Sequence, residues 1–167
     1  MTETNREKLE RLMAQYGTAL IRMCAVYLRD TDLAQDAAQD TFIKAYRNMD
    51  TFRGECSEKS WLMGIAIHTC RDYQRSAWFR HTDRRMESDE WPEIPVPAVI
   101  PDHTVLTEVN RLPKRYREVI LLRYYQGMKL KETADALACS QSTVKQRLRK
   151  ANTILRNRLK EWYYDEE

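Results

Sequence analysis

The sequence predicts an all-α fold, built as two small helical domains joined by an extended linker. Only 4 of its 167 residues are glycine, well below the roughly 7% of an average protein, which disfavours a turn-rich β fold. Apolar residues recur at three- and four-residue intervals in both the first and the last third of the chain, as on one face of a helix. Between them, four of the five prolines lie in WPEIPVPAVIP, where no helix can continue. We therefore predict domains at residues 1–80 and 110–167, with an acidic, Pro-rich linker at 81–109.

Three helices are predicted in the first domain. Leu9, Leu12 and Tyr16 begin one apolar stripe, which continues to Tyr27, and a second helix follows with Asp30 or Asp32 as its N-cap. A polar loop from Asp50 to Lys59 contains Gly54. A third helix then runs from about residue 60, with basic side chains on its later turns.

The second domain has the pattern of a helix-turn-helix over residues 130–150. Pro113 and the stripe from Tyr116 to Tyr124 predict a helix that ends at Gly127. A short helix at 131–137 and a long basic helix from Gln141, capped by Ser140, follow. The intervening turn needs a residue with positive φ, and with no glycine there, Ala138 or Cys139 must adopt it at a cost of about 1 kcal/mol.

The charge is distributed very unevenly. The net charge is +3, yet residues 110–160 carry 14 basic and 3 acidic side chains, whereas residues 81–109 carry 2 basic and 7 acidic ones. A strongly basic helical segment is the electrostatic signature of a nucleic-acid-binding protein. On the second helix, Asp32, Asp36 and Asp40 recur every four residues and form an acidic stripe on one face. This stripe is interpreted either as ordinary solvated surface or as a docking face for a basic protein.

Several other functions are disfavoured. The glycines are too far apart for a phosphate-binding loop, and no charge-free stretch reaches the roughly 18 residues of a membrane span. The 4 cysteines and 3 histidines lack metal-ligand spacing, so we expect no metal, no cofactor and reduced thiols in the cytoplasm. No catalytic constellation is visible, which argues against an enzyme.

Three blocks of the chain resemble a known family. They are DLAQDAAQDTFIKAYRNMDTFRG, SWLMGIAIHTCRDYQR and LPKRYREVILLRYYQGMKLKETADALACSQSTVKQRLRKANTILRNRL. In this order and spacing they resemble the extracytoplasmic-function (ECF) sigma factors of bacterial RNA polymerase, which have only the second and fourth sigma domains. The resemblance implies a non-catalytic subunit that binds core RNA polymerase and directs promoter recognition and transcription initiation, typically in a stress response.

The resemblance also implies three sets of site residues. Those expected to dock on the largest subunits of core polymerase are Asp36, Gln39, Asp40, Phe42, Lys44 and Arg47. Those expected to melt and read the minus-ten promoter element are Arg53, Lys59, Trp61, His68, Arg71 and Arg75. Those expected to enter the major groove at the minus-thirty-five element are Gln141, Ser142, Thr143, Lys145, Gln146, Arg149 and Lys150, with base readout mainly by Gln146 and Arg149.

Relatives in this family are commonly held inactive by an anti-sigma factor, often membrane-tethered, so we expect such a partner. We expect the chain itself to be monomeric and not inserted in a membrane. The alternative within DNA-binding proteins is a stand-alone helix-turn-helix regulator, which would dimerise on a palindromic operator. The alternative from another class is a small helical enzyme, which would need a pocket of convergent titratable groups.

Overall fold

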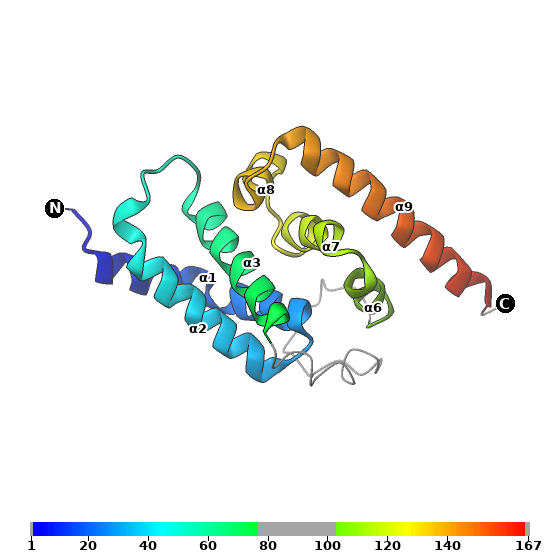
Figure 1. The fold of residues 1–167 in the computed structure, drawn as a ribbon, viewed down its shortest axis with the longest axis horizontal. Coiled ribbons are helices and arrows are strands. Elements are labelled where there is room, and N and C mark those ends of the chain that lie inside the picture. The colour runs from blue at the N-terminus through cyan, green and yellow to red at the C-terminus, as the bar shows by residue number, and fades with distance from the viewer. Residues whose placement is uncertain (1, 77–102, 166–167) are drawn as a thin grey trace.

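The computed structural model describes residues 2–76 and 103–165, and these residues form helices, turns and loops without strands (Figure 1). The all-α prediction is therefore confirmed. The elements in order are α1 (Asn5–Leu28), α2 (Thr31–Arg47), a 3₁₀ turn η1 (Met49–Thr51), α3 (Glu58–Arg75), α6 (His103–Arg111), α7 (Lys114–Ile120), a π-helical turn η2 (Leu121–Tyr125), α8 (Leu130–Leu137) and α9 (Gln141–Asp165).

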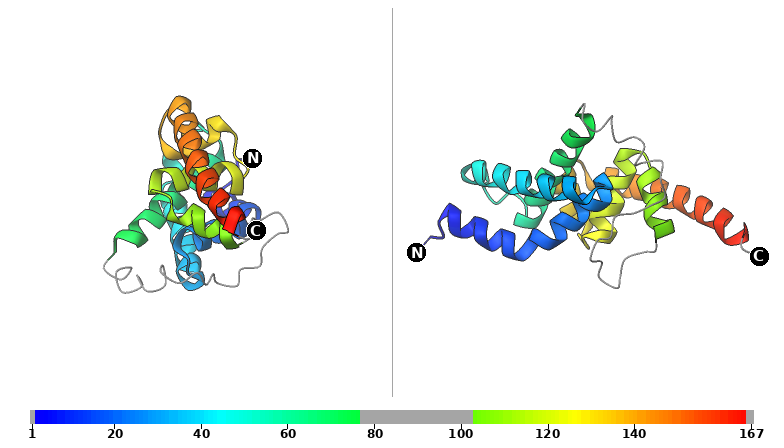
Figure 2. Two further views of the ribbon diagram at one scale, coloured as in Figure 1. Left: turned by 90° about the vertical axis from the view of Figure 1, so that its right-hand side faces the viewer. Right: turned by 90° about the horizontal axis from the view of Figure 1, so that it is seen from below.

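Two helical halves lie side by side. We call α1–α3 the N-terminal half and α6–α9 the C-terminal half; α3 faces α8 across the boundary between them, and α9 projects away from the rest (Figures 1 and 2). The sequence predicted two separate bundles. Both helical domains are present, and they share one continuous buried apolar cluster, which runs from Leu12 in α1 to Leu155 in α9.

The structure caps α2 at Asp30, one of the two predicted positions, and caps α3 at Ser57, which the sequence analysis did not name. Asp30 is the N-cap of α2, where its Oδ1 accepts a hydrogen bond of 3.0 Å from the amide of Leu33. Ser57 caps α3 in the same way by accepting from the amide of Ser60 at 3.1 Å. These oxygens satisfy amides that have no partner within their own helix. Each cap therefore fixes where the following helix begins.

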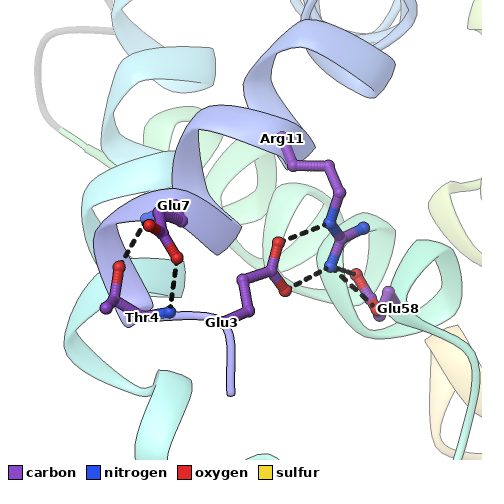
Figure 3. A network of polar contacts seen from close by, with 5 residues as sticks. All are labelled: Glu3, Thr4, Glu7, Arg11 and Glu58. Atoms are coloured by element: carbon purple, nitrogen blue, oxygen red, sulfur yellow. Dashed lines mark hydrogen bonds and ion pairs between the residues drawn. The ribbon is translucent and has the colours of Figure 1, made fainter. Parts of the chain in front are cut away.

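An arginine in α1 ties the start of α3 to the rest of the N-terminal half. Arg11 donates from Nε to Glu3 at 2.8 Å and from Nη2 to Glu58 at 3.1 Å, while Thr4 and Glu7 close a reciprocal capping box at the start of α1 (Figure 3). Glu58 lies in the first turn of α3. The contact therefore positions the end of the loop that precedes α3.

The C-terminal half begins earlier than the sequence predicted. Residues 103–109 were assigned to the extended linker, but they belong to α6. The reason is local: Leu106, Val109 and Leu112 are spaced at helical intervals and are buried against the other helices. The remainder of the predicted linker, residues 81–102, lies outside the described residues.

The predicted helix-turn-helix is present as α8 and α9. Val119, Ala134 and Val144 form a small apolar cluster between the helices, with Leu148 packed against it. Ala138 is the residue that adopts the left-handed conformation, with φ of 53° and ψ of 45°. Ser140 accepts a hydrogen bond from the amide of Thr143 at 3.1 Å and so caps α9.

Ala138 gives a direct test of this turn. We expect Ala138→Gly to raise the free energy of unfolding by about 0.5–1 kcal/mol, because glycine removes the steric cost of positive φ but loses more entropy on folding. Ala14 is also exposed but lies inside α1. Ala14→Gly should therefore lower stability by about 1 kcal/mol. Urea denaturation of both variants measures the two effects, and a decrease in both would contradict this account of the turn.

Candidate functional site

The acidic stripe lies on the solvent side of α2. Asp32, Asp36 and Gln39 are exposed, and Asp40 is partly buried. The buried residues of the same helix, which include Ala34, lie on its opposite side. The spacing of the carboxylates therefore gives the continuous acidic face that the sequence predicted.

An apolar groove of about 590 Å³ lies between α1 and α2, beside the stripe. Met13, Ile43 and Tyr46 line it and are 48%, 41% and 47% exposed. Phe42 also lines the groove but is only 7% exposed, so its side chain is mostly packed in the core. Among the expected docking residues, Gln39 and Arg47 line the groove as well, and both are exposed.

Two of the expected docking residues have partners within the chain. Tyr73 donates a hydrogen bond of 2.5 Å to Asp40, and burial followed by this bond raises the pKa of Tyr73 above its usual value. Lys44 donates to Thr69 at 3.2 Å and lies 3.7 Å from Asp72. Asp40 and Lys44 therefore help to attach α2 to α3.

One face of α3 carries three of the six expected minus-ten residues. Successive helical residues are about 100° apart, so Trp61, His68 and Arg75 fall within an arc of about 40°. His68 and Arg75 are exposed, whereas Trp61 is half-buried and stacks on Phe52 with ring centroids 4.8 Å apart. Arg53, in the loop before α3, is also exposed.

The other two expected minus-ten residues contact the C-terminal half. Lys59 donates to the carbonyl oxygen of Gln126 at 2.7 Å. Arg71 donates from Nε and Nη2 to the carboxylate of Glu118 at 2.7 and 2.5 Å. The hydrogen bonds to Glu118 are the main reason that the pKa of Arg71 is raised.

Sequence reasoning missed Glu118 and its partner Tyr27. Glu118 is 1% exposed, and Tyr27, which is fully buried, donates to it at 2.8 Å. Burial and the nearby carboxylate raise the pKa of Tyr27 far above its usual value, so the hydroxyl stays protonated and remains a donor. One signal was available: Glu118 is the only acidic residue between Glu108 and Glu132 and directly precedes the apolar run Val119–Leu122.

The expected minus-thirty-five residues line the start of α9. Val144 is buried against α8, which turns the neighbouring polar side chains outward. Thr143 is half-buried. The exposed members of the set are Gln141, Ser142, Lys145, Gln146, Arg149 and Lys150.

Residues 2–76 and 103–165 contain no candidate metal site and no candidate membrane span. In these ranges no group of three or more His, Cys, Asp or Glu side chains is placed to hold a metal ion. None of the helices there has both the length and the apolar character needed to cross a membrane.

Family comparisons identify both halves. Residues 12–80 match sigma-70 region 2, and residues 103–152 match sigma-70 region 4. The chain belongs to the sigma-70 family. Similar sigma factors include sigma-H of Pseudomonas aeruginosa, at 26% identity over 90% of this chain and 86% of that protein. The ECF sigma-E factor of Haemophilus influenzae is 24% identical over 89% of this chain and 85% of that protein. These relatives place the chain in the ECF group and favour a sigma factor over a stand-alone regulator.

Solved sigma factor structures share the fold. CnrH, solved in complex with the cytosolic domain of CnrY, superposes with a TM-score of 0.71 over 93% of this sigma factor and 90% of that chain, at 23% identity. RpoE of Bartonella quintana, solved with the anti-sigma factor NepR, superposes with a TM-score of 0.68. The match covers 92% of this chain and 98% of that one, at 24% identity. Both matches span both halves, so the two-domain helical architecture is confirmed.

The bond between Tyr73 and Asp40 can be tested by removing one hydroxyl. We expect Tyr73→Phe to lower the free energy of unfolding by about 1 kcal/mol, because Asp40 loses a donor that attaches α2 to α3. Tyr46→Phe is the matched control, because Tyr46 is 47% exposed on α2. Thermal unfolding of both variants measures the difference. Equal midpoints would show that the hydrogen bond does not stabilise the fold.

Proposed function

We propose that this sigma factor docks on the largest subunits of core RNA polymerase through the apolar groove and the acidic stripe together. The observation that supports this most directly is their adjacency: Met13, Ile43 and Tyr46 are exposed beside the carboxylates of α2. An apolar surface bordered by charge on a small protein is typical of a protein-binding site. The partner it fits is a helical surface with apolar side chains and basic neighbours.

The two parts of this surface would contribute differently. Burial of the groove supplies most of the affinity, since apolar side chains in a desolvated centre dominate binding energy. Asp36 and Gln39, exposed at its edge, set the orientation and increase the association rate with a basic partner. The docking step should therefore weaken as salt concentration rises, without being abolished.

Promoter recognition is then divided between the halves. In the proposed mechanism α3 and its preceding loop hold the melted minus-ten strand, while α9 lies in the major groove at the minus-thirty-five element. Melting costs about 1–2 kcal/mol per base-pair step. Stacking of unpaired bases on aromatic side chains offsets this cost by roughly 1–3 kcal/mol per stacked base. Catalysis belongs to the polymerase, and this chain acts as a non-catalytic initiation subunit.

We also propose that an anti-sigma factor regulates this protein. Two solved proteins of the same fold were each determined with a partner, RpoE with the anti-sigma factor NepR and CnrH with CnrY. A membrane-tethered partner and action in the cytoplasm are part of the same proposal.

Polymerase docking is tested by gel filtration with bacterial core RNA polymerase. The wild type should co-migrate, and a double variant, Asp36→Ala with Gln39→Ala, should bind at least about tenfold more weakly because both polar contacts at the groove edge are lost. Asp40 is left unchanged because its bond to Tyr73 supports the fold. Glu10→Ala is the control, since Glu10 is an exposed carboxylate of α1 outside the stripe. Co-migration of the double variant at wild-type affinity would place docking elsewhere, and failure of the wild type to bind would refute the proposed function.

Base readout by α9 makes a separate prediction. The holoenzyme can be used to select promoters from a random pool of sequences. With Arg149→Ala, the holoenzyme should lose its base preference at one position of the minus-thirty-five element, where discrimination between bases should fall by about 1–3 kcal/mol. Lys150→Ala should weaken binding to all sequences alike and reduce the salt dependence by about one phosphate contact. An unchanged preference in Arg149→Ala would exclude that side chain from base recognition.

A further inference from the structure

A cavity of about 370 Å³, separate from the groove between α1 and α2, lies where α3, α7 and α9 meet. Four of its lining side chains are cationic and one is a carboxylate: they are Arg71, Lys114, Arg115 and Arg147, with Glu118. We propose that this cavity, which we call the anion pocket, binds a compact diphosphate, either inorganic pyrophosphate or the diphosphate group of a nucleotide. Lys114, Arg115 and Arg147 are assigned neither to polymerase docking nor to promoter recognition, so the proposal goes beyond the proposed function.

The carboxylate of Glu118 does not neutralise the anion pocket. It is 1% exposed and accepts hydrogen bonds from Arg71, at 2.7 and 2.5 Å, and from Tyr27 at 2.8 Å. Arg71 alone therefore matches its charge. Arg115 lies over the ring of Tyr116 at 4.9 Å and donates to its hydroxyl, a neutral partner, at 3.3 Å. Within the described residues the three cations other than Arg71 form no ion pair, and they leave the pocket with an excess of positive charge.

Unpaired like charges around one cavity oppose folding. Their repulsion is stronger where water is partly excluded, because the effective dielectric constant falls, and Arg147 is half-buried. Natural proteins break such local rules of stability mainly at functional sites. A cleft lined by charge of one sign also concentrates ions of the opposite sign. The arrangement therefore favours an anionic ligand, whose binding relieves the repulsion.

The geometry of α9 places the anion pocket away from the surface proposed to bind duplex DNA. Gln146 and Arg149, the side chains proposed to read bases, are exposed, whereas Arg147 is half-buried. At about 100° per residue, Arg147 lies roughly 130° around the helix from the midpoint of the other two. Arg71, which also lines the pocket, belongs to α3 of the N-terminal half. A small anion fits such a cavity, whereas a duplex on the exposed face of α9 would lie on another side of the helix.

Charge and size together select the ligand. One phosphate group carries a charge of about −1.5 to −2 near neutral pH, so two linked phosphates match the unpaired cations better than one does. The guanidinium groups of Arg115 and Arg147 can each present two parallel N–H donors to phosphate oxygens, and Lys114 adds a compact charge. The cavity of about 370 Å³ is near the lower end of the roughly 300–1,000 Å³ that is typical of small-molecule sites. A compact diphosphate therefore fits better than an extended polyanion.

Isothermal titration calorimetry of the free chain with sodium pyrophosphate, in magnesium-free buffer, tests the anion pocket. ADP is the second probe, and sodium sulfate is the third because sulfate is a single tetrahedral anion. Two variants each remove one cation from a different helix: Arg147→Gln on α9 and Lys114→Gln on α7. Arg156→Gln is the matched control, since Arg156 is exposed on α9 and does not line the pocket. Circular dichroism verifies that every variant keeps its helices.

We expect pyrophosphate to bind the wild type and the control with equal affinity. Both pocket variants should bind it at least about tenfold more weakly, because each loses one charged hydrogen-bond donor. Sulfate should bind the wild type at least about tenfold more weakly than pyrophosphate does. Without ligand, the pocket variants should be no less stable than the wild type in thermal unfolding, since each loses like-charge repulsion. Tighter binding of ADP than of pyrophosphate would identify a nucleotide as the ligand, and equal or weaker binding of ADP would identify inorganic pyrophosphate.

The proposal would be overturned if the wild type bound neither pyrophosphate nor ADP, or if the pocket variants bound pyrophosphate as tightly as the control does. Sulfate binding as tight as that of pyrophosphate would also overturn it, because that result indicates general ionic screening. A short DNA duplex tests the other source of phosphate groups. If the pocket variants bind the duplex more weakly but pyrophosphate normally, these cations serve the DNA backbone and the diphosphate site is excluded. All of these measurements use the free chain, so their outcome is independent of polymerase docking.

Discussion

The arrangement of the two halves depends on one constraint: a carboxylate removed from water must be given charge and hydrogen bonds by the protein. Among the described residues, Glu118 meets this requirement by reaching across to Tyr27 and Arg71 of the other half. These donors fix how α7 lies against α1 and α3. The close approach of α8 to Gly64 and the contact of Gln126 with Lys59 are compatible with that placement.

Features that depend on neighbouring residues were predictable from the sequence. The Asp30 and Ser140 caps, the left-handed residue in the turn and the exposed faces of α2 and α9 all follow from residue types at fixed local spacings. The start of the C-terminal half was predicted wrongly, because α6 presents only a few apolar residues directly after a proline-rich stretch. So short a periodic pattern does not outweigh the helix-breaking prolines that directly precede it.

Features that depend on distant residues were not predictable. Arg71 and Glu118 are 47 positions apart, and from the sequence alone each has the appearance of an ordinary surface charge. The same is true of Asp40, which the acidic spacing assigned to the stripe, whereas a hydrogen bond from Tyr73 gives it a structural role. Spacing identifies which residues share a face, but only the packed structure shows which faces meet.

The continuous apolar cluster has a consequence for how the protein responds to its own abundance. Both halves belong to one chain, so their contact is intramolecular and forms at a fixed effective concentration. Within one chain its occupancy is the same at low and at high expression. Synthesising more of the protein thus leaves the contact between its two halves unchanged, whereas any contact between separate molecules grows with concentration.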